Sequence, residues 1–279
     1  MHSHPTSQHH VTSRPFLRWA GGKQRLLPQL LPLLASGRRL IEPFLGAGAI
    51  FLGADFREAL LNDANDDLMA LWIAIRERPQ EVIGAARALF DEEYRSATSY
   101  SILRARFNES LDRFERAVLF LYLNRFGFNG LCRYNGHGAF NVPYGRPRRL
   151  PNLPVDEITA AARKLECARL MVGGFGACMQ EAGPGDVVYC DPPYLPAENG
   201  VGFAAYTGKR FGVPEHQQLV DQAWAAARRG ARVLISNHDT AQTRELYRGF
   251  AIASLAARRS IAANAAQRGP VGELVAMLG

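Results

Sequence analysis

The sequence predicts an α/β fold in which a doubly wound sheet is interrupted by a helical insertion. Short apolar stretches alternate with helical patterns over residues 14–66 and again over residues 153–279, as expected where strands and helices alternate along one sheet. Residues 67–152 are mostly helical by periodicity and include a glycine-rich stretch typical of a hairpin. Residues 1–13 hold four of the seven histidines and lack the apolar centre of a signal peptide, so we predict a disordered tail there.

Composition and charge fit a folded protein with a polyanionic partner. The 279 residues are 47% hydrophobic, which is enough for a substantial core, and no apolar run is long enough to span a bilayer. The formal net charge is +7, and residues 67–152 contain thirteen arginines against nine acidic residues. A genomic preference for arginine over lysine would explain why the basic residues are arginines, but it would not explain the positive net charge. Arginine binds phosphates and guanine edges well.

The cysteines indicate neither a zinc site nor a disulfide framework. They form no close Cys-x-x-Cys pair, and this spacing favours reduced thiols in a cytoplasmic protein. The histidines of the first thirteen residues could bind a metal, but a tail explains them better. We therefore expect a cytoplasmic protein without a metal site. The four cysteines are Cys132, Cys167, Cys178 and Cys190.

The first part of the sheet has the features of a nucleoside-binding edge. A strand at 39–41 is followed by the small-residue turn 42–48, which lets a ligand approach the backbone closely. A second strand, 59–61, is followed by Asp63, and an acid at that place can accept both hydroxyls of a ribose. The dinucleotide fingerprint needs a third glycine where Phe51 stands, so a nucleoside without a pyrophosphate is favoured over NAD or FAD.

The middle of the chain predicts helices and then a β-hairpin. Periodicity indicates helices over 67–127, and the extended arms around Asn135-Gly136 predict a hairpin over 126–142. Alternation places Leu131 and Arg133 on one face of this ribbon. A two-stranded ribbon fits the major groove of DNA, where an arginine can bind guanine through two hydrogen bonds. The helical residues expected to share one buried face are Leu68, Leu71, Trp72 and Ile75.

The run Asp-Pro-Pro-Tyr follows a short buried strand, 187–190, and predicts a rigid site for a flat amine. Asp191 and a proline carbonyl can accept the two N–H bonds of an amino group, while Tyr194 stacks on its ring. The prolines fix φ and offer no competing N–H. An ordinary strand exit capped by aspartate is the alternative. The remaining pattern predicts a helix near 215–229 and a strand at 232–236.

Seven blocks in order make the chain, from Arg14 onward, resemble the Dam-type DNA adenine methyltransferase family. The resemblance implies a Rossmann-like methyltransferase sheet with an inserted DNA-recognition domain. It also implies S-adenosylmethionine as methyl donor and adenine N6 within GATC of double-stranded DNA as acceptor. The blocks are FLRWAGGK (16–23), EPFLGAGAIF (42–51), LNDANDDL (61–68), AVLFLYLNRFGFNGLCRYN (117–135), FNVPYG (140–145), VVYCDPPY (187–194) and LISNHDT (234–240).

The resemblance also assigns a cofactor site. Its floor is the turn after the first strand, Asp63 binds the ribose hydroxyls and Phe175 packs on the cofactor's adenine. Core packing remains the alternative for Trp19 and Phe175, and a solvated helix start is the alternative for Lys23. The implied cofactor residues are Trp19, Lys23, Glu42, Phe44, Gly46, Asp63, Phe175 and Asp191.

The implied reaction is direct displacement on an adenine flipped out of the duplex. Asp191, Pro192 and Tyr194 would hold the base, without a metal or a covalent enzyme intermediate. Phe128 would insert beside the flipped base and Asn129 would meet the orphaned thymine. The implied DNA-binding residues are Arg18, Phe128, Asn129, Leu131, Arg133 and Pro143. Arg258 and Arg259 are candidates for phosphate contacts, and a solvated basic turn is the alternative.

Two other classes of function remain open on the residues alone. A methyltransferase acting on RNA or on a protein amide could share the cofactor fold and a Pro-Pro-Tyr loop. A non-enzymatic DNA-binding module would explain the charge and the hairpin but would leave Asp191 and Asp63 without a purpose. We expect the enzyme, acting as a monomer in solution.

Overall fold

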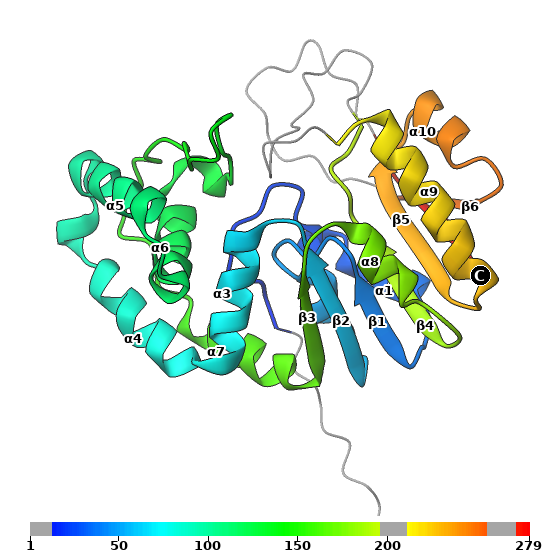
Figure 1. Cartoon of the computed structure of the whole chain (residues 1–279), viewed down its shortest axis with the longest axis horizontal. Helices are drawn as coiled ribbons and strands as arrows, with labels where there is room; N and C mark the ends of the chain where they lie inside the picture. The colour runs from blue at the N-terminus through cyan, green and yellow to red at the C-terminus, as the bar shows by residue number, and fades with distance from the viewer. Residues whose placement is uncertain (1–12, 196–210, 256–271) are drawn as a thin grey trace, which may run out of the picture.

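The computed structural model describes residues 13–195, 211–255 and 272–279. Strands from these residues form one seven-stranded sheet in the order β3-β2-β1-β4-β5-β7-β6 (Figure 1). The neighbours from β3 to β5 are parallel, whereas β7 is antiparallel to both β5 and β6. The strands are β1 (Arg39–Glu42), β2 (Glu58–Asp63), β3 (Ala168–Val172), β4 (Asp186–Cys190), β5 (Arg232–His238), β6 (Ala251–Leu255) and β7 (Glu273–Leu278).

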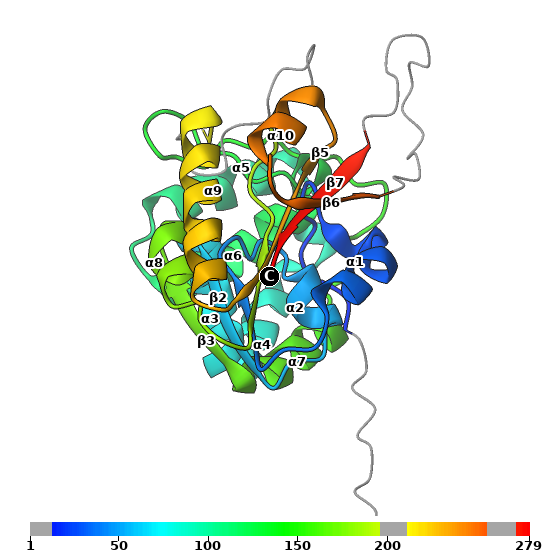
Figure 2. The same ribbon diagram turned by 90° about the vertical axis from the view of Figure 1, so that its right-hand side faces the viewer.

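Helices cover both faces of this sheet, with α8 and α9 on one face and α1 and α2 on the other (Figure 2). Successive strand residues alternate between the faces, so Leu40 packs in one hydrophobic cluster and Ile41 in the other. Because both faces are buried, the central strands are almost continuously apolar. The helices are α1 (Leu27–Leu34), α2 (Ala49–Gly53), α8 (Phe175–Gln180), α9 (Val213–Arg228) and the short α10 (Ala241–Leu246) beyond β5.

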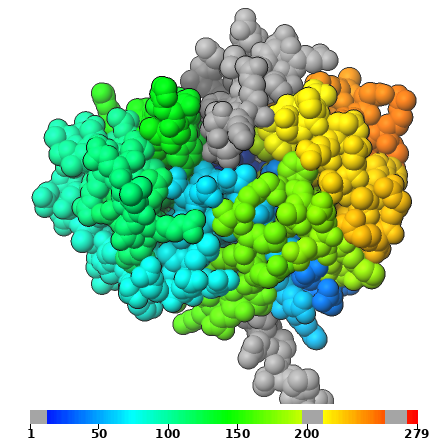
Figure 3. Space-filling model, viewed as in Figure 1, coloured from blue at the N-terminus to red at the C-terminus, as the bar shows by residue number. Residues whose placement is uncertain are grey.

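A second group of helices forms a layer beside the β3 edge of the sheet (Figure 1). In the space-filling view, these cyan and green residues fill the left side of the molecule (Figure 3). Side-chain caps start three of them, since Asn65, Ser96 and Asp112 each accept from backbone N–H groups of the following turn. The helices are α3 (Asp66–Glu77), α4 (Pro79–Leu89), α5 (Ala97–Glu109), α6 (Arg113–Phe126) and α7 (Val155–Lys164). The 3₁₀ turns are η1 (Lys23–Arg25), η2 (Glu92–Tyr94), η3 (Phe128–Gly130) and η4 (Leu165–Cys167).

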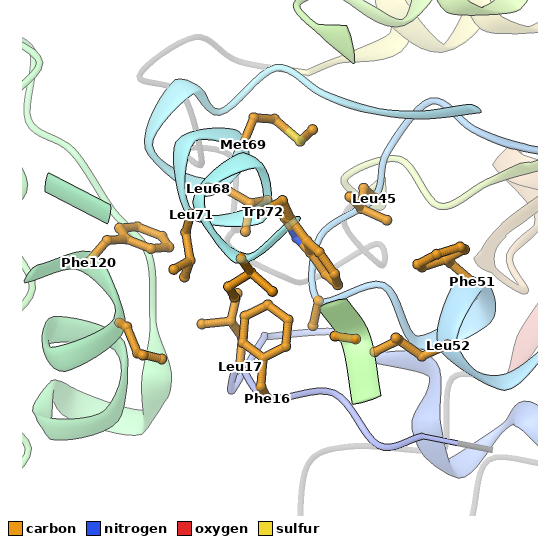
Figure 4. Close-up of a cluster of buried hydrophobic side chains, with 14 of the residues drawn as sticks. Phe16, Leu17, Leu45, Phe51, Leu52, Leu68, Met69, Leu71, Trp72 and Phe120 are labelled. Atoms are coloured by element: carbon orange, nitrogen blue, oxygen red, sulfur yellow. The ribbon is translucent and has the colours of Figure 1, made fainter. Parts of the chain in front are cut away.

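Helix α3 joins this layer to the sheet. Its predicted buried face is confirmed, because Leu68, Leu71, Trp72 and Ile75 are all fully buried. Figure 4 shows Trp72 extending from α3 toward Leu45 and Phe16, and the rings of Phe16 and Trp72 meet edge to face at 4.7 Å. The packing of α3 against both α6 and the sheet fixes the helical layer relative to β2.

The predicted β-hairpin forms only around its turn. Antiparallel pairing is limited to the isolated bridges Tyr134–Phe140 and Gly127–Tyr144. The turn itself is as predicted, with the Gly138 N–H donating to the Asn135 carbonyl at 3.0 Å. The prediction of a regular two-stranded ribbon over 126–142 is wrong. The first arm is interrupted by η3, in which Asn129 takes a left-handed φ of 52° that lies outside the β region of a regular strand.

The other predicted elements agree with the structure within one or two residues. The strands predicted at 39–41, 59–61, 187–190 and 232–236 correspond to β1, β2, β4 and β5, and the helix near 215–229 corresponds to α9. Strands β3, β6 and β7 and helices α1, α7, α8 and α10 were not predicted. Among the placed residues, no helix has the length and apolarity to cross a membrane. Residues 1–12 of the predicted tail, Arg258 and Arg259 lie outside the described residues.

Candidate functional site

Parallel strands bring three acidic residues to one edge of the sheet. The register pairs Glu42 with Leu61 and Ile41 with Val188, so β1, β2 and β4 end close together. Glu42 and Asp63 are the last residues of their strands, and Asp191 follows β4 directly. The carboxyl edge of an open α/β sheet is where such folds bind ligands.

The glycine turn after β1 is folded onto Asp63. The Gly46 N–H donates to Oδ2 of Asp63 at 2.9 Å, and the Asn65 N–H donates to Oδ1 at 3.0 Å. Each carboxylate oxygen has two lone pairs, so both can still accept a ligand hydroxyl. Burial raises the pKa of Asp63, and the backbone N–H groups of Gly46, Asn65 and Ala64 oppose that rise. Asp63 therefore has the position and the acceptor capacity predicted for it.

Gly46 is required at its position for two reasons. Its φ is +51°, a left-handed conformation that favours glycine, and a Cβ there would lie 2.8 Å from Nε1 of Trp19. On the other side, Nε1 of Trp72 donates to the Gly46 carbonyl at 3.1 Å. The structure thus brings Trp19, Gly46 and Asp63 together, as the sequence predicted.

Glu42 is an acid buried at this edge with one oxygen unused. Its Oε1 has no hydrogen-bond partner among the described residues. Burial raises the pKa of Glu42 well above its ordinary value, and the nearby Asp191 charge acts in the same direction. Buried polar atoms without partners are uncommon in folded proteins, so Glu42 is a candidate to receive a ligand's hydrogen bond.

Two of the predicted cofactor aromatics lie against each other. The rings of Phe44 and Phe175 stack with centroids 5.4 Å apart, and Phe211 meets Phe44 edge to face at 5.7 Å. Phe44 and Phe175 are partly exposed, at the edge of the cluster that packs under α8 and α9. They can form an apolar wall for a flat ring, but core packing of Phe175 remains an open alternative.

Asp191 is held by two side chains that meet the same oxygen. Ser236 Oγ donates to Oδ1 at 2.9 Å, and Lys23 Nζ lies 2.8 Å from Oδ1. Lys23 is buried and also lies over the Tyr194 ring, with Nζ 4.7 Å from its centroid. The alternative that Lys23 is a solvated lysine at a helix start is therefore wrong. It lies in the Asp-Pro-Pro-Tyr site.

Residues at the end of β5 and in α9 fix the loop that carries Asp191. Asn237 Oδ1 accepts from the Leu195 N–H at 3.3 Å, and His238 Nδ1 lies 2.9 Å from the Leu195 carbonyl. His216 Nε2 lies 3.0 Å from the Pro193 carbonyl. Burial lowers the pKa of His216 to about 4, so the neutral ring donates this bond near neutral pH.

Sequence reasoning did not assign these loop-holding residues to the site. The block LISNHDT contains three of them and was used only as part of a resemblance. The fourth such residue, His216, lies within helix α9, where no sequence motif marks it as part of the site. The residues that the structure adds to the site are His216, Ser236, Asn237, His238 and Glu273.

The predicted DNA-binding residues gather on the loop between α6 and α7, which Figure 1 shows at the upper end of the helical layer. The Phe128 N–H donates to the Pro143 carbonyl at 2.9 Å, so Phe128 and Pro143 are neighbours. Phe128 is 47% exposed, an unusual state for an aromatic ring. The adjacent Asn129 is also exposed, and Leu131 is partly buried.

Arg18 reaches this loop from the start of the chain. Its backbone is clamped by Asn124, which accepts from the Arg18 N–H at 2.9 Å and donates to the Arg18 carbonyl at 2.7 Å. Gly130 touches the same residue, since a Cβ on Gly130 would lie 2.3 Å from Cβ of Arg18. The backbone of Arg18 is therefore fixed while its side chain stays exposed.

Arg133 is exposed and is held by its neighbour across the turn. Its Nε donates to Asn141 Oδ1 at 2.7 Å, and Nη2 donates to the Asn141 carbonyl at 3.1 Å. This fork leaves guanidinium N–H groups for another acceptor, because arginine has five donors. All six predicted DNA-binding residues thus lie on, or beside, one loop.

Comparisons with known proteins agree with this arrangement. A family model described as D12 class N6 adenine-specific DNA methyltransferase matches residues 19–261. The DNA adenine methylase of Escherichia coli strain K12 is 44% identical over 265 residues, covering 95% of both chains. The DNA adenine methylase of Vibrio cholerae El Tor Inaba N16961 is 42% identical, again covering 95% of both chains. The DNA adenine methylase of Serratia marcescens is 41% identical, covering 95% of this chain and 98% of that protein.

The chain therefore belongs to the D12 class of N6 adenine-specific DNA methyltransferases. Within that class it is a Dam-type DNA adenine methyltransferase that uses S-adenosylmethionine, which confirms the predicted family, activity and cofactor.

The residues present fit S-adenosylmethionine. Asp63 offers both carboxylate oxygens beside the Gly46 turn, and Glu42 has a buried oxygen without a partner among the described residues. A cation placed beside this buried acid would favour its ionised form, and the cofactor carries an ammonium and a sulfonium. The stacked rings of Phe44 and Phe175 could offer an apolar face to a flat ring such as adenine.

Proposed function

We propose that the chain methylates adenine N6 within GATC of duplex DNA after flipping the adenine into the Asp-Pro-Pro-Tyr site. S-adenosylmethionine, when bound, supplies an electrophilic methyl group. The observation that carries this proposal is the immobilised carboxylate of Asp191, which Ser236 and Lys23 both contact through Oδ1. The other oxygen, Oδ2, can accept an N–H from the adenine amino group.

The chemistry required of the protein is positioning and electrostatics. Asp191 and the Pro192 carbonyl accept the two amino N–H bonds, so the nitrogen lone pair is directed at the methyl group. Tyr194 stacks on the ring, and its own position is fixed by contacts described above and by Glu273. As N6 becomes positive, the fixed carboxylate stabilises it without reorganisation.

Recognition of the target is proposed to reside in residues 67–152 together with Arg18. Phe128 is exposed beside Pro143, where it can enter the stack left by the flipped base, and Asn129 can meet the orphaned thymine. Arg18, Leu131, Arg133 and Pro143 are proposed to read the neighbouring base pairs. Flipping costs a few kcal/mol, roughly what insertion of an aromatic ring and new base contacts can offset.

The test is transfer of labelled methyl groups to matched duplexes that contain GATC, GATT or no related site. Label confined to the GATC adenine is the expected result. Label on adenines of every duplex would keep the chemistry and refute the GATC specificity. A duplex in which N6-methyladenine already occupies both GATC adenines is the control for the acceptor atom, because it should take up no label.

A further inference from the structure

Glu273 lies at the active site although it is at the start of its strand, whereas the parallel strands bring their final residues to the site. It is the first residue of β7, which is antiparallel to β5, and the register pairs it with His238 at the carboxyl end of β5. Only an antiparallel strand brings its first residue to the edge where the parallel strands end. Glu273 therefore lies beside the loop that carries Asp191, although it is far from that loop in sequence.

The Glu273 carboxylate contacts two residues of the site. The Tyr194 hydroxyl donates to Oε1 of Glu273, and Lys23 Nζ lies 3.6 Å from the same oxygen. The exposed fractions of these side chains are 14% for Glu273 and 5% for Lys23, so the contacts are shielded from bulk water. Lys23 thus lies between two carboxylates, at 2.8 Å from Asp191 and 3.6 Å from Glu273.

We propose that Glu273 is a positioning residue for adenine methylation, acting through Tyr194 and Lys23. The assignment rests on the proposed function, because it takes Tyr194 as the ring that stacks on the flipped adenine. A tyrosine held only at its Cα can turn about two side-chain torsions. The bond from its hydroxyl to Glu273 fixes the far end of the ring as well, and so fixes the plane on which the base must lie.

Glu273 also sets the charge of the site. Lys23, Asp191 and Glu273 together carry one net negative charge when all three are ionised. That charge matches the positive charge that develops on N6 during methyl transfer. Without Glu273 the sum is zero and Lys23 has only Asp191 as an anionic partner among the described residues. The carboxylate that must accept from adenine is then bound more tightly by lysine.

The experiment measures the single-turnover rate constant for methylation of a GATC duplex, with S-adenosylhomocysteine affinity and thermal unfolding measured beside it. Glu273→Ala should lower the rate constant by roughly 10- to 100-fold, the factor for a lost hydrogen bond to a charged group. S-adenosylhomocysteine affinity should stay within about twofold, because Glu273 contacts Tyr194 and Lys23 at the Asp-Pro-Pro-Tyr loop rather than Asp63 or the Gly46 turn.

Two further variants separate the contact with Tyr194 from the charge. Glu273→Gln keeps an acceptor for the tyrosine hydroxyl and nearly the same volume, so its rate should lie between wild type and Glu273→Ala. In a Tyr194→Phe background, Glu273→Ala should cost less than it does alone, because the shared hydrogen bond is already absent. Glu245→Gln, which changes an exposed partner of Arg248, is the matched control for removing one carboxylate.

Three results would overturn the proposal. The first is a Glu273→Ala rate within threefold of wild type, and the second is a parallel loss of cofactor affinity. The third is full additivity of Glu273→Ala and Tyr194→Phe. If Glu273→Ala unfolds, Glu273→Gln and Tyr194→Phe decide together. Glu273→Gln removes the charge and Tyr194→Phe removes the hydrogen bond, so wild-type rates in both variants would overturn the proposal. Failure of the wild-type enzyme to methylate GATC would refute the proposed function instead.

Discussion

The sheet edge and the loop between α6 and α7 position their functional residues in different ways. At the sheet edge, side chains are largely buried and are held by other side chains, as Asp191 is held by Ser236 and Lys23. On the loop, most of the proposed DNA-binding side chains are exposed and it is mainly the backbone that is held, although the Arg133 guanidinium also donates to Asn141. Asn124 clamps both backbone groups of Arg18, and the Pro143 carbonyl accepts from Phe128.

This difference suits the two tasks. A transferring methyl group tolerates little displacement, so the acceptor site needs fixed side-chain atoms before the substrate arrives. Side chains that read a base pair in duplex DNA must move into a groove. Because most side chains on the loop are exposed and held mainly through their backbones, they keep this freedom, and Arg133 would exchange its bonds to Asn141 for bonds to a base. Substitutions at the sheet edge should therefore change rate, whereas substitutions on the loop should change which DNA is chosen.

The largest expected effect comes from Asp191→Ala. Losing the acceptor for the adenine amino group should reduce the methylation rate constant by about 10³-fold or more, while much of the duplex affinity remains. Rate is measured by labelled methyl transfer and affinity by titration of a fluorescent GATC duplex. A near wild-type rate in the purified variant would show that Asp191 does not hold the acceptor. Loss of rate and duplex affinity together would erase the contrast between the two regions.

Arg133→Ala is expected to have the opposite profile. Its rate at saturating GATC should change little, but the preference for GATC over GATT should fall by roughly 10- to 100-fold, the equivalent of one lost two-bond base contact. Arg87→Ala is the matched control, because it removes an exposed arginine from α4 and changes the net charge equally. Unchanged discrimination in Arg133→Ala, or an equal loss in Arg87→Ala, would contradict base reading by Arg133.

Local sequence signals predicted the sheet edge well where the evidence lay within one strand and its exit. Apolar runs ending in Asp63 and Asp191 gave both positions, because a strand that is buried on both faces must be apolar until it leaves the sheet. Glu273 could not be found in this way. Its place depends on the antiparallel insertion of β7 between β5 and β6, which is a property of the whole topology.

The loop shows the opposite balance. Its proposed DNA-binding residues were predicted from the resemblance, whereas its backbone was predicted too regularly. Alternating residues and an Asn-Gly turn favoured a ribbon, but the left-handed Asn129 and the close contact of Gly130 with Arg18 impose a different path on the first arm. Periodicity reports which side chains share a face, and it does not report a long-range contact that bends the chain.

The smallest expected effect concerns His216, which is fully buried and holds the loop that carries Asp191. Burial lowers its pKa from 6.5 to about 4, so between these values the unfolded chain binds a proton that the folded protein does not. His216 therefore destabilises the fold progressively as pH falls through this window, by on the order of 1 kcal/mol per pH unit. Above pH 6.5 this contribution is absent.

His216→Gln isolates that contribution, because a glutamine can donate to the Pro193 carbonyl without titrating. The unfolding free energy of the variant, from denaturant titrations at several pH values, should fall less steeply than that of wild type between pH 6.5 and 4. Other groups titrate equally in both proteins, so the difference between the two curves reports residue 216 alone. Parallel curves would mean that the histidine is solvated or charged in the fold. In that case the loop that carries Asp191 would be held by Asn237 and His238 of β5 and not also by His216 of α9.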